Sequence, residues 1–113
     1  MNPLRWVRRW QLRRMKEIVS TNDVSHGTAK RMRIRAICPQ QEDVRLARRI
    51  KRLLPEQDLI FLFCYTDQSA YADGIIHTRI RIGKPAHRSA NGLWAKSTFI
   101  EDDVIEIAFE EGE

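Results

Sequence analysis

The stretch LIFLFCY, residues 59–65, decides how the rest of the chain has to be arranged. It is apolar without interruption and rich in β-forming residues, as in a strand that is buried on both faces. Such a strand lies inside a sheet, and each of its faces needs a covering layer. One amphipathic helix can cover only one of them. We therefore expect either an N-terminal helix or a second copy of the chain on the other face.

The segment before this stretch supplies a neighbouring strand and one covering helix. Residues 30–38, KRMRIRAIC, alternate strictly between apolar and basic side chains, which predicts a strand with one solvated, cationic face. This cationic face consists of Arg31, Arg33 and Arg35. Residues 41–54 place apolar side chains at helical spacing, with acids at the start and a proline just past the end. The outer side of this predicted helix is formed by Arg45, Arg48, Arg49 and Arg52.

The chain after residue 65 is predicted to continue with strands. Residues 75–83, IIHTRIRIG, alternate again and should pair antiparallel with residues 59–65. A last strand near the C-terminus turns Ile105, Ile107 and Phe109 inward and has acidic residues around it. These acids have natural partners in the arginine-bearing strands, because opposite charges across a ladder attract each other.

The N-terminal segment is basic and amphipathic. Residues 4–16, LRWVRRWQLRRMK, contain two tryptophans, five arginines and a lysine but no acid. Helical spacing gathers their apolar side chains on one arc, so residues 1–19 are predicted to form a helix, followed by a linker at residues 20–29. Organellar presequences and membrane-surface helices have a similar composition, but the need for cover on residues 59–65 favours a structural helix. We expect Trp6 and Trp10 to pack inward, with an outer face of Arg5, Arg9, Arg13 and Lys16.

Together these elements predict a small α+β protein. A chain of 113 residues with 42% hydrophobic residues forms a single domain with one modest core. The expected order is α-β-α-β-β-β, with a four-stranded, mostly antiparallel sheet on which the helices pack. Residues 30–113 are its α+β core. The longest apolar run, residues 59–65, is much too short to span a bilayer, and no secretory signal is recognisable, so we expect no transmembrane segment and a cytoplasmic protein.

Charge is divided unevenly along the chain. Residues 1–52 hold 15 basic and 4 acidic residues, whereas residues 53–113 hold 5 basic and 11 acidic residues. An asymmetry of this kind points to an anionic partner for the basic half. The alternative is that the two halves neutralise each other within one fold, with the C-terminal acids masking the arginine-bearing strands.

No stretch matches a catalytic motif. The three histidines lack the spacing of a metal site, and Cys38 and Cys64 lie in strand-like segments as small buried residues, so we expect no metal, no cofactor and no catalytic group. Asp67 and Asp73 are interpreted as turn and capping residues. A metal-independent ribonuclease remains a second alternative, because it needs only an acid, a base and cations around the phosphate. The residues that could serve are His77, Arg79, Arg81, Lys84, His87 and Arg88.

The arginine-rich faces carry the functional prediction. Arginine pairs bidentately with phosphate and stacks on bases, so this distribution favours binding of RNA or DNA without catalysis. The predicted contact residues are Arg5, Arg9, Arg13, Lys16, Arg31, Arg33, Arg35, Arg45, Arg48, Arg49 and Arg52. The alternative is a protein-binding regulator or inhibitor that docks on an acidic protein surface and offers its acidic C-terminal strand as an open edge. A homodimer is also expected, because of the extra apolar surface.

Overall fold

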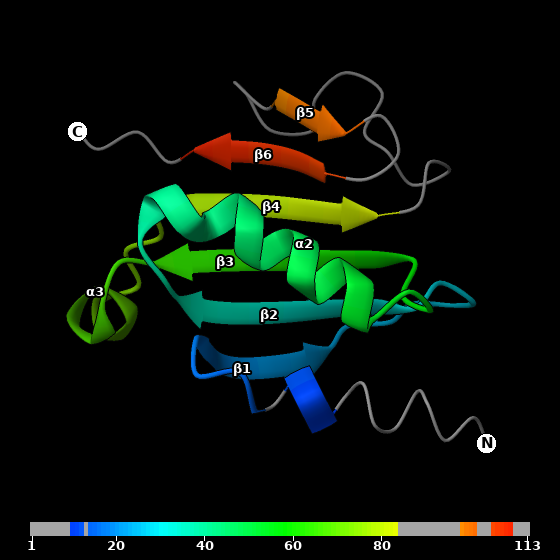
Figure 1. Ribbon diagram of the computed structural model, residues 1–113. Coiled ribbons are helices and arrows are strands. Elements are labelled where there is room, and N and C mark those ends of the chain that lie inside the picture. Colours follow the sequence, from blue (N-terminus) through cyan, green and yellow to red (C-terminus); the bar gives the residue numbers. More distant parts are fainter. Residues whose placement is uncertain (1–9, 13, 84–97, 102–104, 110–113) are drawn as a thin grey trace.

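The computed structural model describes residues 10–12, 14–83, 98–101 and 105–109, and its centre is one six-stranded sheet with the strand order β1-β2-β3-β4-β6-β5 (Figure 1). The strands are β1 (Ile18–Asp23), β2 (Arg31–Ile37), β3 (Leu59–Tyr65), β4 (Thr78–Gly83), β5 (Thr98–Glu101) and β6 (Ile105–Phe109). The helices are a short 3-10 turn η1 (Gln40–Glu42), α2 (Asp43–Leu53) and α3 (Gln68–Asp73). The α+β class predicted from the sequence is confirmed.

The unit β2–α2–β3 forms the middle of the fold. β2 and β3 run parallel, in a register that places Arg33 beside Phe61 and Arg35 beside Phe63. Parallel neighbours need a crossover, and α2 provides it while lying across one face of the sheet (Figure 1). The bounds predicted for the central strand, residues 59–65, agree with those of β3.

The core lies between α2 and this covered face of the sheet. Leu46, Ala47 and Ile50 of α2 are buried there. The strand residues that meet them all have even numbers, because successive side chains of a strand point to opposite faces. They are Met32, Ile34, Ala36, Ile60, Leu62, Cys64, Ile80 and Ile82.

The connection between β3 and β4 is helical, although only a turn was expected. Asp67 caps α3, because its side chain accepts a hydrogen bond from the backbone N–H of Ala70 at 2.8 Å. Gly74 ends the helix with φ at +71°, in the left-handed region that favours glycine. The interpretation of Asp67 as a capping residue is confirmed.

The N-terminal prediction is wrong in its boundaries. The expected helix of residues 1–19 and linker of residues 20–29 overlap β1, which begins at Ile18 and pairs antiparallel with β2. Ile18, Val19 and Thr21 are β-branched, and the segment pairs with the otherwise unprotected edge of β2, with an irregularity at Val19 between Ile18 and Ser20. Residues 10–12 and 14 are helical, whereas residues 1–9 and 13 lie outside the described residues.

The sheet is wider than the four strands predicted. β4 pairs with β3 and with β6, and β6 pairs in turn with β5, all antiparallel. The two strands that the sequence did not predict, β1 and β5, are the edges. The strand that contains Ile105, Ile107 and Phe109 is therefore an inner strand, and the expectation that it offers an open edge to a partner is wrong.

Candidate functional site

The face of the sheet opposite α2 carries arginine and phenylalanine in alternating columns. β3 contributes Phe61 and Phe63 to this face, with β2 on one side and β4 on the other. The cross-strand registers of β2–β3 and β3–β4 define two rows across the three strands. We call their six residues the Arg–Phe face, and the rows are Arg33–Phe61–Arg81 and Arg35–Phe63–Arg79.

The six side chains of the Arg–Phe face are half-buried, and they form a surface that no described helix crosses. α3 reaches only its end, where Tyr71 packs edge-on against Tyr65 with ring centroids 5.1 Å apart. Of the two covers expected for the second face of residues 59–65, an N-terminal helix is not found there among the described residues, and a second copy of the chain stays a prediction. The arginines of the neighbouring strands lie beside the phenylalanine rings instead.

The arginines of β4 lie over the two rings. The guanidinium carbon of Arg79 is 5.9 Å from the ring centroid of Phe63, and that of Arg81 is 5.8 Å from the centroid of Phe61. A cation within about 6 Å of an aromatic centroid is attracted by the negative face of the ring. The flat faces of both rings are thus accessible to a planar, positively charged group.

The arginines of β2 are separated from the acidic end of the sheet. β6 contains Glu106, which is the register partner of Arg81 in β4. β3 and β4 lie between β6 and β2, so masking of the β2 arginines by this strand does not occur. Within residues 10–12, 14–83, 98–101 and 105–109, the guanidinium groups of Arg31, Arg33 and Arg35 make no ion pair. This strand therefore offers positive charge that the described fold leaves uncompensated.

The predicted contact residues fall on opposite sides of the molecule. Arg31, Arg33 and Arg35 belong to the face away from α2, as expected from their alternation. Four arginines occupy the outer side of α2 and are exposed, also as expected, namely Arg45, Arg48, Arg49 and Arg52. Nη1 of Arg49 lies 3.0 Å from Oε2 of Glu17, and Arg48 also has an interaction partner. The sheet and α2 thus form two separate basic surfaces.

The N-terminal face is only partly described. Lys16 is exposed as expected, whereas Trp6, Arg5, Arg9 and Arg13 lie outside the described residues. The prediction that Trp10 packs inward is wrong, because its side chain is 49% exposed and Arg14 lies 4.7 Å from its ring centroid. Leu12 and Met15 reach the core instead, on the same side as α2. The chain turns into β1 directly afterwards, so the described part of this segment, residues 10–12 and 14–17, lies on the α2 side of the sheet and not over the second face of β3.

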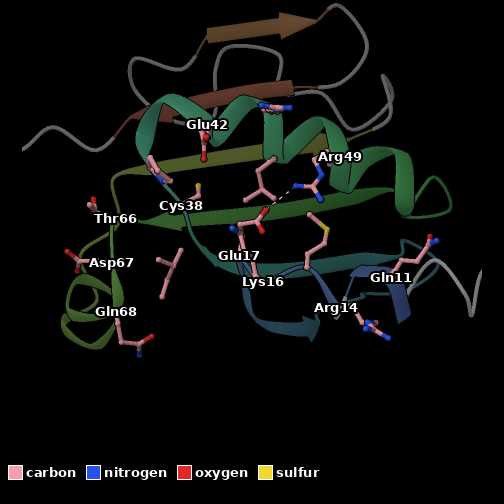
Figure 2. Close-up of a pocket in the computed structure, with 15 residues that line it drawn as sticks. Gln11, Arg14, Lys16, Glu17, Cys38, Glu42, Arg49, Thr66, Asp67 and Gln68 are labelled. Carbon is pink, nitrogen blue, oxygen red and sulfur yellow. Dashed lines mark hydrogen bonds and ion pairs between the residues drawn. The ribbon is translucent and has the colours of Figure 1, made fainter.

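A groove opens between the N-terminal segment, the start of α2 and the loop that leads to α3 (Figure 2). Its walls carry cations such as Arg14 and Lys16 together with acids such as Glu42 and Asp67. Because both signs of charge are present, the lining selects no charged ligand. The groove is next to the Arg49–Glu17 ion pair and far from the two aromatic rows, on the other side of the sheet.

Both cysteines are buried, free and neighbours, as the sequence suggested for small core residues. A side-chain hydrogen bond from Cys64 lowers the pKa of the Cys38 thiol, against the opposing effect of burial. The same hydrogen bond, reinforced by burial, raises the pKa of the Cys64 thiol. Cys38 is the one of the two that lines the groove.

A buried polar chain links α2 to β4 and β2. Thr78 donates from Oγ1 to Oδ2 of Asp43 at 2.9 Å and is 2.7 Å from Nδ1 of His77. The other ring nitrogen of His77, Nε2, lies 2.9 Å from the backbone oxygen of Cys38. Both nitrogens of this histidine are therefore occupied within the fold. The ribonuclease alternative combined this ring with Arg79 and Arg81 and with Lys84, His87 and Arg88; the last three lie outside the described residues, so it stays a prediction.

Sequence reasoning missed the aromatic half of the Arg–Phe face. Phe61 and Phe63 were taken as buried on both sides, and Arg79 and Arg81 were considered only for a ribonuclease. The sequence contains a pattern that could have shown this. In three segments predicted to be strands, these arginines and phenylalanines all occupy odd positions, and alternate residues of a strand point to the same face. Only the registers show that they form rows.

Further observations bear on the class of protein. Within the described ranges there is no group of three or more side chains that could hold a metal ion, and no helix long and apolar enough to span a bilayer. Comparison with protein-family models, with curated proteins and with solved structures finds no match. The function has to be argued from the residues of this chain.

Proposed function

We propose that the protein binds nucleic acid through the Arg–Phe face. The observation that carries the proposal is the pair of Arg–Phe–Arg rows on three adjacent strands. Arginine offers a planar fork of donors that fits phosphate, and an aromatic ring beside it offers a surface for a base. Four guanidinium groups around two rings are unusual for a sheet face that is packed into a protein core, because charged groups are rarely buried there unless they are paired.

The location of the acidic residues also supports binding of a polyanion to the Arg–Phe face. The arginines of β2 have no carboxylate partner within the described residues. Two strands, β3 and β4, separate them from the strand that contains Glu106. A polyanion can therefore reach Arg33 and Arg35 without first displacing a protein carboxylate. With two phosphate contacts on a single strand, at Arg33 and Arg35, the binding constant should fall with salt with a logarithmic slope of about −1.4, which is roughly sevenfold between 50 and 200 mM.

The outer side of α2 is the competing surface. It was included in the sequence prediction, but its arginines have no aromatic side chain between them, and Arg49 already pairs with Glu17. This surface offers charge alone. A nucleic acid would be held there only by its phosphates, and we therefore assign it at most an accessory role.

Two matched double variants separate the surfaces. Arg33→Gln with Arg35→Gln removes two charges from the sheet, and Arg45→Gln with Arg52→Gln removes two charges from α2. Neither pair of residues makes a side-chain ion pair within the described part of the chain. Fluorescence anisotropy of a labelled oligonucleotide at 50 and 200 mM salt should give a slope shallower by about 1.4 for the sheet variant only.

The outcomes are decisive. Loss of binding in the α2 variant with normal binding in the sheet variant would transfer the function to the helix and overturn the proposal. Absence of binding of any oligonucleotide to the unmodified protein at low salt would also overturn it. Circular dichroism and melting curves of both variants establish that each one is folded.

A further inference from the structure

The spacing of the two phenylalanines bears on the form of the nucleic acid. Phe61 and Phe63 are two residues apart on β3, so their positions differ by about 6.6 Å along the strand. Bases stacked in a duplex follow each other at about 3.4 Å along each strand. Two consecutive bases placed on the two rings are thus about twice as far apart as in a duplex. Such a spacing requires an extended, unstacked strand.

The width of the sheet leads to the same conclusion. Six strands at a spacing of about 4.8 Å extend over roughly 24 Å between the outer strands. The major groove of B-form DNA is about 12 Å wide and admits a helix or a two-stranded ribbon. The Arg–Phe face lies in the middle of the sheet, with β1 on one side and β6 and β5 on the other. The edges of duplex bases therefore cannot reach Phe61 and Phe63.

The contacts over the rings indicate how a base is accommodated. Guanidinium groups of Arg79 and Arg81 already lie over Phe63 and Phe61 at 5.9 and 5.8 Å. A nucleobase is a planar group of similar thickness and stacks on the same ring faces. The displaced guanidinium group can then stack on the base or pair with a phosphate.

The arginines of β2 indicate where the sugar-phosphate backbone of the nucleic acid would lie. Arg33 and Arg35 follow the same two-residue spacing on β2, next to the two phenylalanines. Phosphates on these arginines leave the attached bases over β3, about one strand spacing away. Each row can thus hold one nucleotide, with the phosphate on the arginine of β2 and the base on the phenylalanine of β3.

We propose that the Arg–Phe face takes single-stranded nucleic acid, with two consecutive bases stacked on Phe61 and Phe63 and their phosphates on Arg33 and Arg35. This inference rests on the proposed function and specifies its ligand. Stacking on an aromatic side chain changes binding by roughly five- to 150-fold per base. It is tolerant of sequence, because every base has a flat face.

Three probes of equal length test the inference on the unmodified protein. They are a single-stranded oligonucleotide, its duplex and an abasic strand with the same phosphates but no bases. The single strand should bind at least tenfold more tightly than the abasic strand and than the duplex. The comparison is made with DNA and with RNA versions of the single strand, and a preference over the matching abasic strand in either version supports the inference.

Variants of the rings provide the second measurement. Phe61→Leu and Phe63→Leu remove the aromatic faces but keep apolar bulk, and each should reduce the preference for the single strand over the abasic strand at least fivefold. Phe61→Trp should keep this preference and report binding by fluorescence. If a leucine variant fails to fold, the abasic comparison on the unmodified protein still decides.

Failure of the inference differs from failure of the proposed function. Equal affinity for the single strand and the abasic strand, or for the single strand and the duplex, would overturn base stacking while leaving phosphate binding in place. No binding of any of the three probes at low salt would overturn the proposed function itself. A preference unchanged by both leucine variants would also contradict stacking on these rings.

Discussion

Removing the hydroxyl group of Thr78 should destabilise the protein by much more than the loss of an exposed hydroxyl. Thr78 is completely buried at the start of β4, and its Oγ1 joins Asp43 and His77 at 2.9 and 2.7 Å. Valine has nearly the same shape, so Thr78→Val creates no cavity. Its effect on the free energy of unfolding then reports only the loss of the hydroxyl group's hydrogen bonds. The change leaves Oδ2 of the buried Asp43 without its donor, whereas His77 is half-buried and can turn to water.

The size of the effect follows from the partner. A hydrogen bond to a charged group contributes about 1.5–3 kcal/mol, compared with about 0.5–1.5 kcal/mol for a neutral pair. For a domain of this length, 1 kcal/mol corresponds to about 4 °C in melting temperature, so we expect a decrease of roughly 6–12 °C. Repeated in an Asp43→Asn background, Thr78→Val should cost only the smaller, neutral amount.

The assay is urea unfolding of the two single variants, the double variant and a control. Thr66→Val changes an exposed threonine in the loop before α3 and should stay within about 0.5 kcal/mol of the unmodified protein. The role assigned to these hydrogen bonds would be refuted if Thr78→Val lowered the free energy of unfolding no more than this control does. It would also be refuted if the decrease were equal with aspartate and with asparagine at position 43.

Two further predictions concern other parts of the fold. Ile34→Ala empties a fully buried position in the centre of β2, and urea unfolding should show a loss of about 2–5 kcal/mol, whereas a loss below 1 kcal/mol would contradict the described core. Because a hydrogen bond from Cys64 lowers the pKa of Cys38, Cys64→Ala should move the alkylation profile of Cys38 with iodoacetamide to higher pH. Mass spectrometry across pH measures this profile, and an unshifted profile would show that the bond is unimportant.

The elements with a strong period could be predicted from the sequence, and the weakly patterned ones could not. β2 and β3 were predicted within one residue and α2 within two, because alternation or helical spacing extends over their whole length. β1 was assigned to a helix and a linker. Its first two residues continue the helical pattern of the N-terminal segment, the other four are polar as in a linker, and pairing with the edge of β2 makes all six a strand.

Only part of the Arg–Phe face was predicted from the sequence, for a related reason. Alternation predicts which face a side chain lies on, and Arg33 and Arg35 were placed correctly. Alternation cannot predict which strands are neighbours or in which register they pair. Phe61 could therefore be assigned to the Arg–Phe face only once β2 and β4 were placed on its two sides. A continuous apolar run also hides such a surface, since it suggests burial on both faces.

The strand order separates the arginines of β2 from the acidic strands of the sheet. β4 also carries arginines, but it is next to β6, and Arg81 is the register partner of Glu106. A single strand of nucleic acid lying along β2 would have its phosphates on Arg33 and Arg35 and its bases over β3, whereas a backbone on the β4 side would approach β6. The positions of the acids therefore favour the β2 side of Phe61 and Phe63 for the phosphates. An electrostatic effect of this kind weakens with salt, whereas stacking on the rings does not. Raising the salt concentration should for this reason increase the relative loss caused by Phe61→Leu and decrease that caused by Arg33→Gln.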